Sequence, residues 1–184
     1  MFGKDGLGVN YFCHRFECHL YLKENRIDAF GKENITFEAI YSPMTGFVSE
    51  HYVINGSKEN MRFNGKPFDK HERIGVNIGS VKKFTKPVQP GEKLTFQTTA
   101  DYIGVFPDNI EWLSVFVPHP IGTIDYWVYF NEGDLPKEDW EHHYNVASSR
   151  HFDAFPIELE NNVTHIRVLN PDMEKVYDIR WKWD

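Results

Sequence analysis

The last eight residues alternate strictly between apolar and polar side chains, and this pattern constrains the fold more than any other feature. The apolar positions are Tyr177, Ile179, Trp181 and Trp183, and the polar positions are Asp178, Arg180, Lys182 and Asp184. Successive side chains of a strand face opposite sides of a sheet, so this period predicts a half-buried β-strand. We expect its apolar face to pack on a second sheet and its polar face to be solvated. We also expect it to pair with 163–169 across the turn at 170–172.

Length and composition indicate one folded domain. With 184 residues, of which 26% are charged, the chain can bury a core of its own and does not have the composition of a disordered protein. Residues 1–8 contain three glycines and are predicted to form a flexible leader, which leaves 9–184 as the domain. Aromatic residues make up 16%, and such residues favour strands.

Further strands are predicted wherever short apolar or alternating segments stand between turn residues. The segments are 9–22, 35–41, 47–54, 74–84, 94–102, 110–117, 123–130, 157–159 and 163–169. We therefore predict an all-β fold, an Ig-like antiparallel β-sandwich of about eight to ten strands. One short helix is predicted near 134–143, because Asp134 suits its N-cap and Pro136 its first turn.

Charge and cysteines restrict the partners and the compartment. The net charge is −7 and no basic run exceeds Lys82-Lys83, so nucleic acid is not an expected partner. No apolar run approaches the roughly 18 residues of a membrane span, and no signal segment opens the chain, so we expect a cytoplasmic protein that does not act at membranes. Alternation from 9 to 22 places Cys13 and Cys18 on opposite faces of one strand. We predict two free thiols.

The segments 110–117 and 123–130 are apolar on both faces, and such strands need a contact on each side. The surplus aromatic surface suggests a ligand or a partner protein near them. Connections between strands often carry functional groups. We therefore add His119 from the turn between these two segments, and Arg150 and His151 from the loop after the predicted helix. The candidate ligand-binding residues are His119, Trp112, Trp127, Tyr129, Arg150 and His151. Core packing and a solvated turn explain the same residues without a ligand.

Glu138, His142 and His143 form a weaker alternative as metal ligands. On the predicted helix, the i,i+4 spacing would put Glu138 and His142 on one face. An exposed acidic helix with ordinary ion pairs is the plainer interpretation of the same spacing.

No enzyme motif is present: the sequence lacks a P-loop, a dinucleotide glycine motif, G-x-S-x-G and H-E-x-x-H. We therefore expect a non-enzymatic recognition or sensor module that binds a protein partner or a small ligand, without a cofactor. It could be one part of a larger protein or assembly. Two alternatives stay open: a His/carboxylate enzyme on a β-scaffold, with or without a metal, and a β-barrel that carries an apolar ligand.

Overall fold

The computed structural model describes residues 10–51, 55–74, 77–117, 119–145, 152–157 and 159–184, and these form fourteen strands and no helix. The large sheet has the order β13 (Val163–Leu169), β10 (Ile121–Tyr129), β1 (Tyr11–Leu22), β2 (Ala29–Ala39), β8 (Lys93–Ile103), β4 (Ser57–Phe63) and β5 (Lys66–Pro67). A four-stranded sheet has the order β12 (Phe152–Pro156), β11 (Glu138–Asn145), β14 (Lys175–Lys182) and β9 (Ile110–Phe116). A three-stranded sheet has the order β3 (Met44–His51), β7 (Asn77–Val88) and β6 (Lys70–Ile74). The all-β prediction is confirmed.

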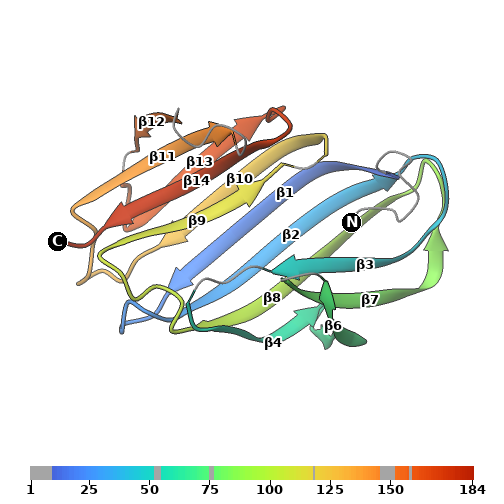
Figure 1. Ribbon diagram of the computed structural model, residues 1–184, viewed down its shortest axis with the longest axis horizontal. Helices are drawn as coiled ribbons and strands as arrows, with labels where there is room; N and C mark the ends of the chain where they lie inside the picture. The colour runs from blue at the N-terminus through green and yellow to red at the C-terminus, as the bar shows by residue number, and fades with distance from the viewer. Residues whose placement is uncertain (1–9, 52–54, 75–76, 118, 146–151, 158) are drawn as a thin grey trace.

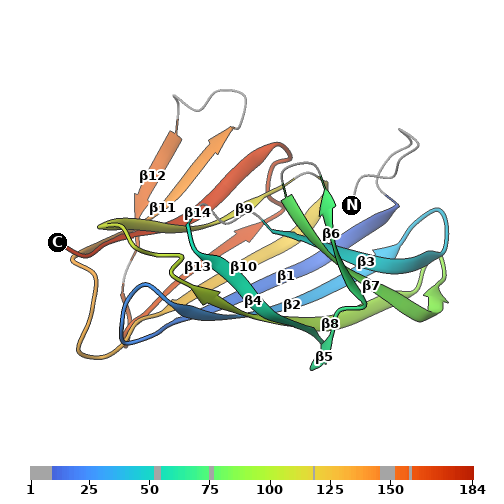
Figure 2. The ribbon, with the colours of Figure 1, turned by 60° about the horizontal axis from the view of Figure 1, so that its bottom comes forward.

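Both small sheets lie on the same side of the large sheet (Figures 1 and 2). The four-stranded sheet contributes Trp181, which is fully buried with Phe106 and Phe130 at ring-centroid distances of 5.5 and 5.9 Å. The three-stranded sheet contributes Phe47, whose ring lies 4.6 Å from that of Phe96 on β8. The core therefore fills the space between the layers, and none of the described strands covers the other side of the large sheet.

The prediction of a purely antiparallel fold is wrong at one pair. Among the strands that the structure describes, β1 and β10 pair in parallel, with Glu17 opposite Asp125 and His19 opposite Trp127. The other described pairs are antiparallel. Side-chain alternation has the same period in both arrangements, so it carries no information about strand direction.

The terminal strand faces the core as predicted but pairs differently. Ile179 and Trp181 of β14 are fully buried. However, β14 pairs with β11 and β9, whereas β13 pairs with β10 in the large sheet. The chain thus changes sheets at the turn after β13, where Asn170 has a φ of 48°. Because β14 is central in its sheet, the predicted solvated face is partly covered, and Asp178 is buried beside Arg180, whose Nε lies 2.8 Å away.

The predicted helix at 134–143 is wrong, because 138–145 forms strand β11 between β14 and β12. Asp134 closes a tight turn instead of capping a helix: its N–H donates to the Asn131 carbonyl at 2.9 Å. Pairing with two strands outweighs weak local helix preferences. No helix of the described chain is long and apolar enough to cross a membrane. The predicted leader, 1–8, lies outside the described residues.

A β-bulge in β1 corrects the predicted faces of the two cysteines. The register with β2 shifts between Cys13 and Arg15, so His14 is the extra residue. One inserted residue reverses the alternation, and Cys13 therefore joins Cys18 on the inner face, where both are buried. Both thiols are free, as predicted.

Candidate functional site

The outer face of the large sheet, meaning the side away from the small sheets, carries aligned rows of polar and aromatic residues. Residues directly opposite one another on neighbouring strands share a face, so the pairing register fixes each row. The polar row is Arg167, Asp125, Glu17, Asn34 and Gln97. The imidazole row is His165, Trp127, His19, Lys32 and Thr99. The aromatic row is Val163, Tyr129, Tyr21, Phe30 and Asp101.

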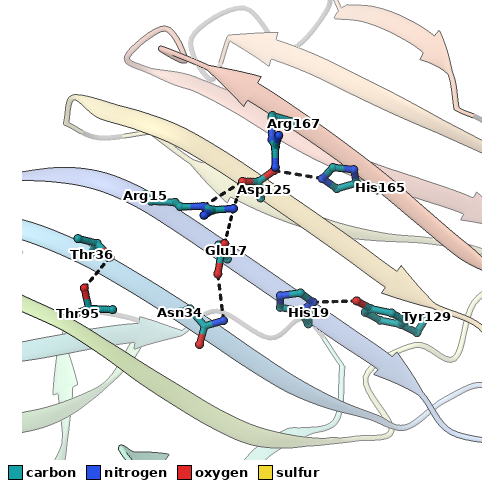
Figure 3. Close-up of polar contacts among 10 residues, drawn as sticks. All are labelled: Arg15, Glu17, His19, Asn34, Thr36, Thr95, Asp125, Tyr129, His165 and Arg167. Carbon is teal, nitrogen blue, oxygen red and sulfur yellow. Dashed lines mark hydrogen bonds and ion pairs between the residues drawn. The ribbon is translucent and has the colours of Figure 1, made fainter.

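Asp125 is the centre of the polar row, and its carboxylate is fully buried. Arg167 donates its Nε–H to Oδ1 at 2.6 Å, and His165 Nε2 lies 3.2 Å from the same oxygen. Arg15 approaches Oδ2 through Nε at 3.3 Å and Nη2 at 3.2 Å (Figure 3). Burial alone would raise the pKa of Asp125, but the hydrogen bonds from Arg167 and His165 outweigh it and hold that pKa below its ordinary value.

Hydrogen bonds continue from this centre across the sheet. Arg15 Nη2 lies 2.5 Å from Glu17 Oε1, and Asn34 donates from Nδ2 to Glu17 Oε2 at 3.1 Å. Gln97 in turn donates from Nε2 to Asn34 Oδ1 at 3.1 Å. The network therefore links five neighbouring strands, from β13 to β8, and restrains the rotamers of its members. Figure 3 shows its part from Arg167 to Asn34.

Three members of the imidazole row, His19, Trp127 and His165, form a stack of rings. Trp127 lies between His19 and His165, with centroid distances of 4.3 and 4.4 Å and interplanar angles of 3° and 7°. In the neighbouring row, Tyr21 and Tyr129 stack at 4.4 Å and 11°. His19 Nδ1 also lies 3.0 Å from the Tyr129 hydroxyl, which joins the two rows.

This stacking decides what the rings can offer a ligand. Both faces of Trp127 are covered by imidazoles, so a planar ligand cannot stack on it without displacing one of them. The rings instead present their edges. Burial is the main reason that the pKa of His19 lies below its ordinary value, which keeps this ring neutral near pH 7.

The structure brings together two of the predicted site residues, Trp127 and Tyr129, on the outer face. Trp112 lies on β9 in the four-stranded sheet, 38% exposed, with the Arg180 guanidinium 5.7 Å from its ring. His119 precedes β10 and contacts Tyr11, with ring centroids 4.6 Å apart. Burial lowers the pKa of His119 to about 4.

Other predicted residues cannot be placed as a site. Arg150 and His151 lie outside the described residues, and so do the side chains of His142 and His143. Four residues of a strand span about 13 Å, so the spacing that would gather Glu138 and His142 on a helix does not do so on β11. In the part of the chain that the structure describes, no group of three His, Cys, Asp or Glu side chains could hold a metal ion.

Sequence reasoning missed the centre of the outer face. Asp125 is a lone acid within an apolar segment, and its partners Arg15 and Arg167 lie 110 and 42 residues away. The one available signal was the isolated carboxylate itself, because a buried acid requires partners.

A second polar group lies on the inner face of the large sheet. Lys58 Nζ is 3.6 Å from Glu33 Oε1, and Thr98 donates its hydroxyl to Glu33 Oε2 at 2.6 Å. Lys58 also lies 4.9 Å from the centre of the Tyr102 ring. Burial lowers the pKa of Lys58, but Tyr102 and Glu33 more than offset this, so the net pKa is raised. These side chains come from three strands and fix β2, β8 and β4 against one another.

Comparisons with known proteins give a distant structural similarity only. No family model matches the chain, and no curated protein matches it. An M1 zinc metallopeptidase from Deinococcus radiodurans superposes with a TM-score of 0.45 at 12% identity, over 92% of this chain and 42% of that one. A mutant of a two-domain M1 zinc metallopeptidase bound to L-tryptophan gives a TM-score of 0.47 at 12% identity, over 94% and 43%. The chain thus spans less than half the length of these proteins, and no residue role or activity is transferred from them.

Proposed function

We propose that this chain is a non-enzymatic recognition module that binds a small ligand or a protein partner through the outer face of its large sheet. The observation that carries the proposal is Asp125, a fully buried carboxylate that holds two half-exposed arginines and a histidine in place. A solvent-exposed sheet face with no binding role does not require a buried charge, because burying a charge costs free energy. Ordered polar groups on an uncovered face reduce the entropy lost on binding.

The outer face suits a polar ligand more than an apolar one. Its aromatic rings are stacked on one another, and its polar row runs across five strands. The net charge of −7 disfavours nucleic acid. The two free, buried thiols favour a reducing compartment such as the cytoplasm.

One contact, between His71 and Ser80, bears on the enzyme alternative, and the burial of Ser80 speaks against it. His71 Nδ1 lies 2.8 Å from Ser80 Oγ, a spacing that could activate a hydroxyl. However, Ser80 is fully buried, and its hydroxyl also contacts the Met61 sulfur at 3.2 Å. A substrate could not reach that oxygen in this fold.

The test is to map backbone amide NMR shifts while titrating the intact chain with sulfate, a neutral oligosaccharide and a mixed-sequence peptide. Saturable shifts should cluster on β13, β10 and β1. Thr123→Trp places a large side chain on the outer face of β10, opposite Arg15, and should abolish them, whereas Ser114→Trp on the exposed side of β9 should leave them unchanged. Shifts centred elsewhere, or none with any probe, would overturn the proposal.

A further inference from the structure

Arg15 on β1 and Arg167 on β13 both donate to the Asp125 carboxylate on the outer face, and both keep unused N–H groups. We propose that Arg15 and Arg167, positioned by Asp125, form a binding site for a tetrahedral oxyanion, namely the phosphate or sulfate group of a ligand. This inference rests on the proposed function and names the ligand chemistry of its surface.

The hydrogen-bonding capacity of Asp125 is already filled. Its two oxygens have about four lone-pair sites. They meet four donor contacts, two from Arg15 and one each from Arg167 and His165. Further N–H groups of the arginines are therefore not needed to satisfy the buried carboxylate.

The unused donors belong to exposed groups. A guanidinium carries five N–H donors in a rigid fork. In the contacts of the described residues, Arg167 uses Nε alone, and Arg15 uses Nε and Nη2. The side chains of Arg167 and Arg15 are 51% and 48% exposed, so their remaining Nη groups can reach a ligand in solution.

The site would bind an anion through donors that are already held in position, and not through a net positive charge. Asp125 and Glu17 offset the two arginines, so an anion gains little from long-range attraction. It gains from charge-assisted hydrogen bonds whose donors are already held in place. The free donors are both Nη groups of Arg167 and Nη1 of Arg15. These three nitrogens match the three terminal oxygens of a phosphate or sulfate ester, whereas a carboxylate has two oxygens.

The experiment follows the side-chain Nε–Hε NMR signals of Arg15 and Arg167 during titration with sodium sulfate, against sodium chloride at equal ionic strength. We expect saturable shifts of both signals with sulfate and with O-phosphoserine, and only linear drift with chloride. Inorganic phosphate should bind like O-phosphoserine if the group alone is recognised; much tighter binding of O-phosphoserine would identify an ester-bearing ligand.

Arg167→Lys keeps the charge and removes the fork, and it should weaken sulfate binding about tenfold, the loss of one charge-assisted hydrogen bond. Arg15→Lys gives a second test of the same kind. Lys93→Gln, a 59% exposed lysine beside Glu38, is the matched control and should bind like the wild type. Circular dichroism confirms that each variant is folded.

Equal binding by Arg167→Lys and the wild type would overturn the inference, as would acetate binding as tightly as sulfate or linear sulfate shifts. If sulfate fails but the neutral oligosaccharide or the peptide still binds the outer face, this inference alone falls. If every probe fails there, the proposed function falls with it.

Discussion

Gly122 of β10 lies against the backbone carbonyl of His14: a Cβ atom built at position 122 would stand 2.6 Å from that oxygen. His14 is the bulge residue of β1, and the parallel partner strand passes directly beside it. The missing side chain at Gly122 therefore allows β10 to pair in register with a strand that carries an extra residue. The β1–β10 register that places Glu17 beside Asp125 and His19 beside Trp127 on the outer face therefore depends on this contact.

Gly122→Ala should destabilise the protein by about 2 kcal/mol, since a methyl group forced against backbone cannot be relieved by a rotamer change. Urea denaturation measures this effect. Gly133→Ala is the control, because nothing lies within 4 Å of a Cβ at that position, and its stability should stay within about 0.5 kcal/mol of the wild type. Equal stability of both variants would show that the close approach does not matter.

The same bulge explains which parts of the fold could be predicted. Alternation correctly assigns the inner face of β14, which has no bulge, with Ile179 and Trp181 buried. It fails for Cys13, because one extra residue reverses the faces and leaves no mark in the residue types. The helix predicted at 134–143 relied on Asp134 and Pro136 and not on alternation, and it is wrong because turn residues before strand β11 resemble helix-start residues.

Cys13 and Cys18 should both resist a thiol reagent in the folded protein. Both are buried on the inner face, and burial raises the pKa of Cys13 to about 12, so almost no reactive thiolate forms at neutral pH. Titration with a chromogenic disulfide reagent should give no fast thiol in buffer and two in denaturant. One thiol reacting at once in buffer would restore the interpretation in which the two cysteines occupy opposite faces.

Lys58→Met should destabilise the protein by about 2 kcal/mol, because it removes the cation beside Glu33, whose side chain is only 16% exposed. Replacing both partners should cost less than this, since Lys58→Met with Glu33→Leu removes both half-buried charges and leaves two apolar side chains in contact. A double-mutant cycle in urea measures the difference. Additive losses from the two single variants would indicate that the pair is not coupled.

His119 should remain neutral well below the usual range of histidine. Its pKa of about 4 compares with about 6.5 in an unfolded chain, so the unfolded state takes up the proton first as the pH falls. Stability is therefore lost progressively from about pH 6.5 towards pH 4, and His119→Gln should remove this part of the loss. NMR titration of the ring gives the pKa directly, and a midpoint near 6.5 would contradict the burial of this imidazole.

The outer-face site could not be assembled from the sequence, because its members become neighbours only through strand order. The surplus of aromatic residues in 123–130 predicts Trp127 and Tyr129 as site residues. By contrast, His19 and His165 reach Trp127 through the parallel β1–β10 pair and the β10–β13 pair. Both pairings join segments distant in the chain, and alternation fixes the face of a residue but not its cross-strand neighbour.

Asp125→Asn should cost about 2 kcal/mol at pH 7, because the charge-assisted hydrogen bonds from Arg15, Arg167 and His165 are lost. The pKa of Asp125 is held below its ordinary value, so its contribution is present above about pH 4 and is lost as the pH falls further. The stability gap between the wild type and Asp125→Asn in urea should therefore narrow from pH 7 to pH 3.

Asp101→Asn, on the same face and hydrogen-bonded by Asn60 at 2.9 Å, is the control and should change stability by about 0.5 kcal/mol or less. A gap that stays constant with pH would mean that the shape of the Asp125 side chain, and not its charge, holds the two arginines.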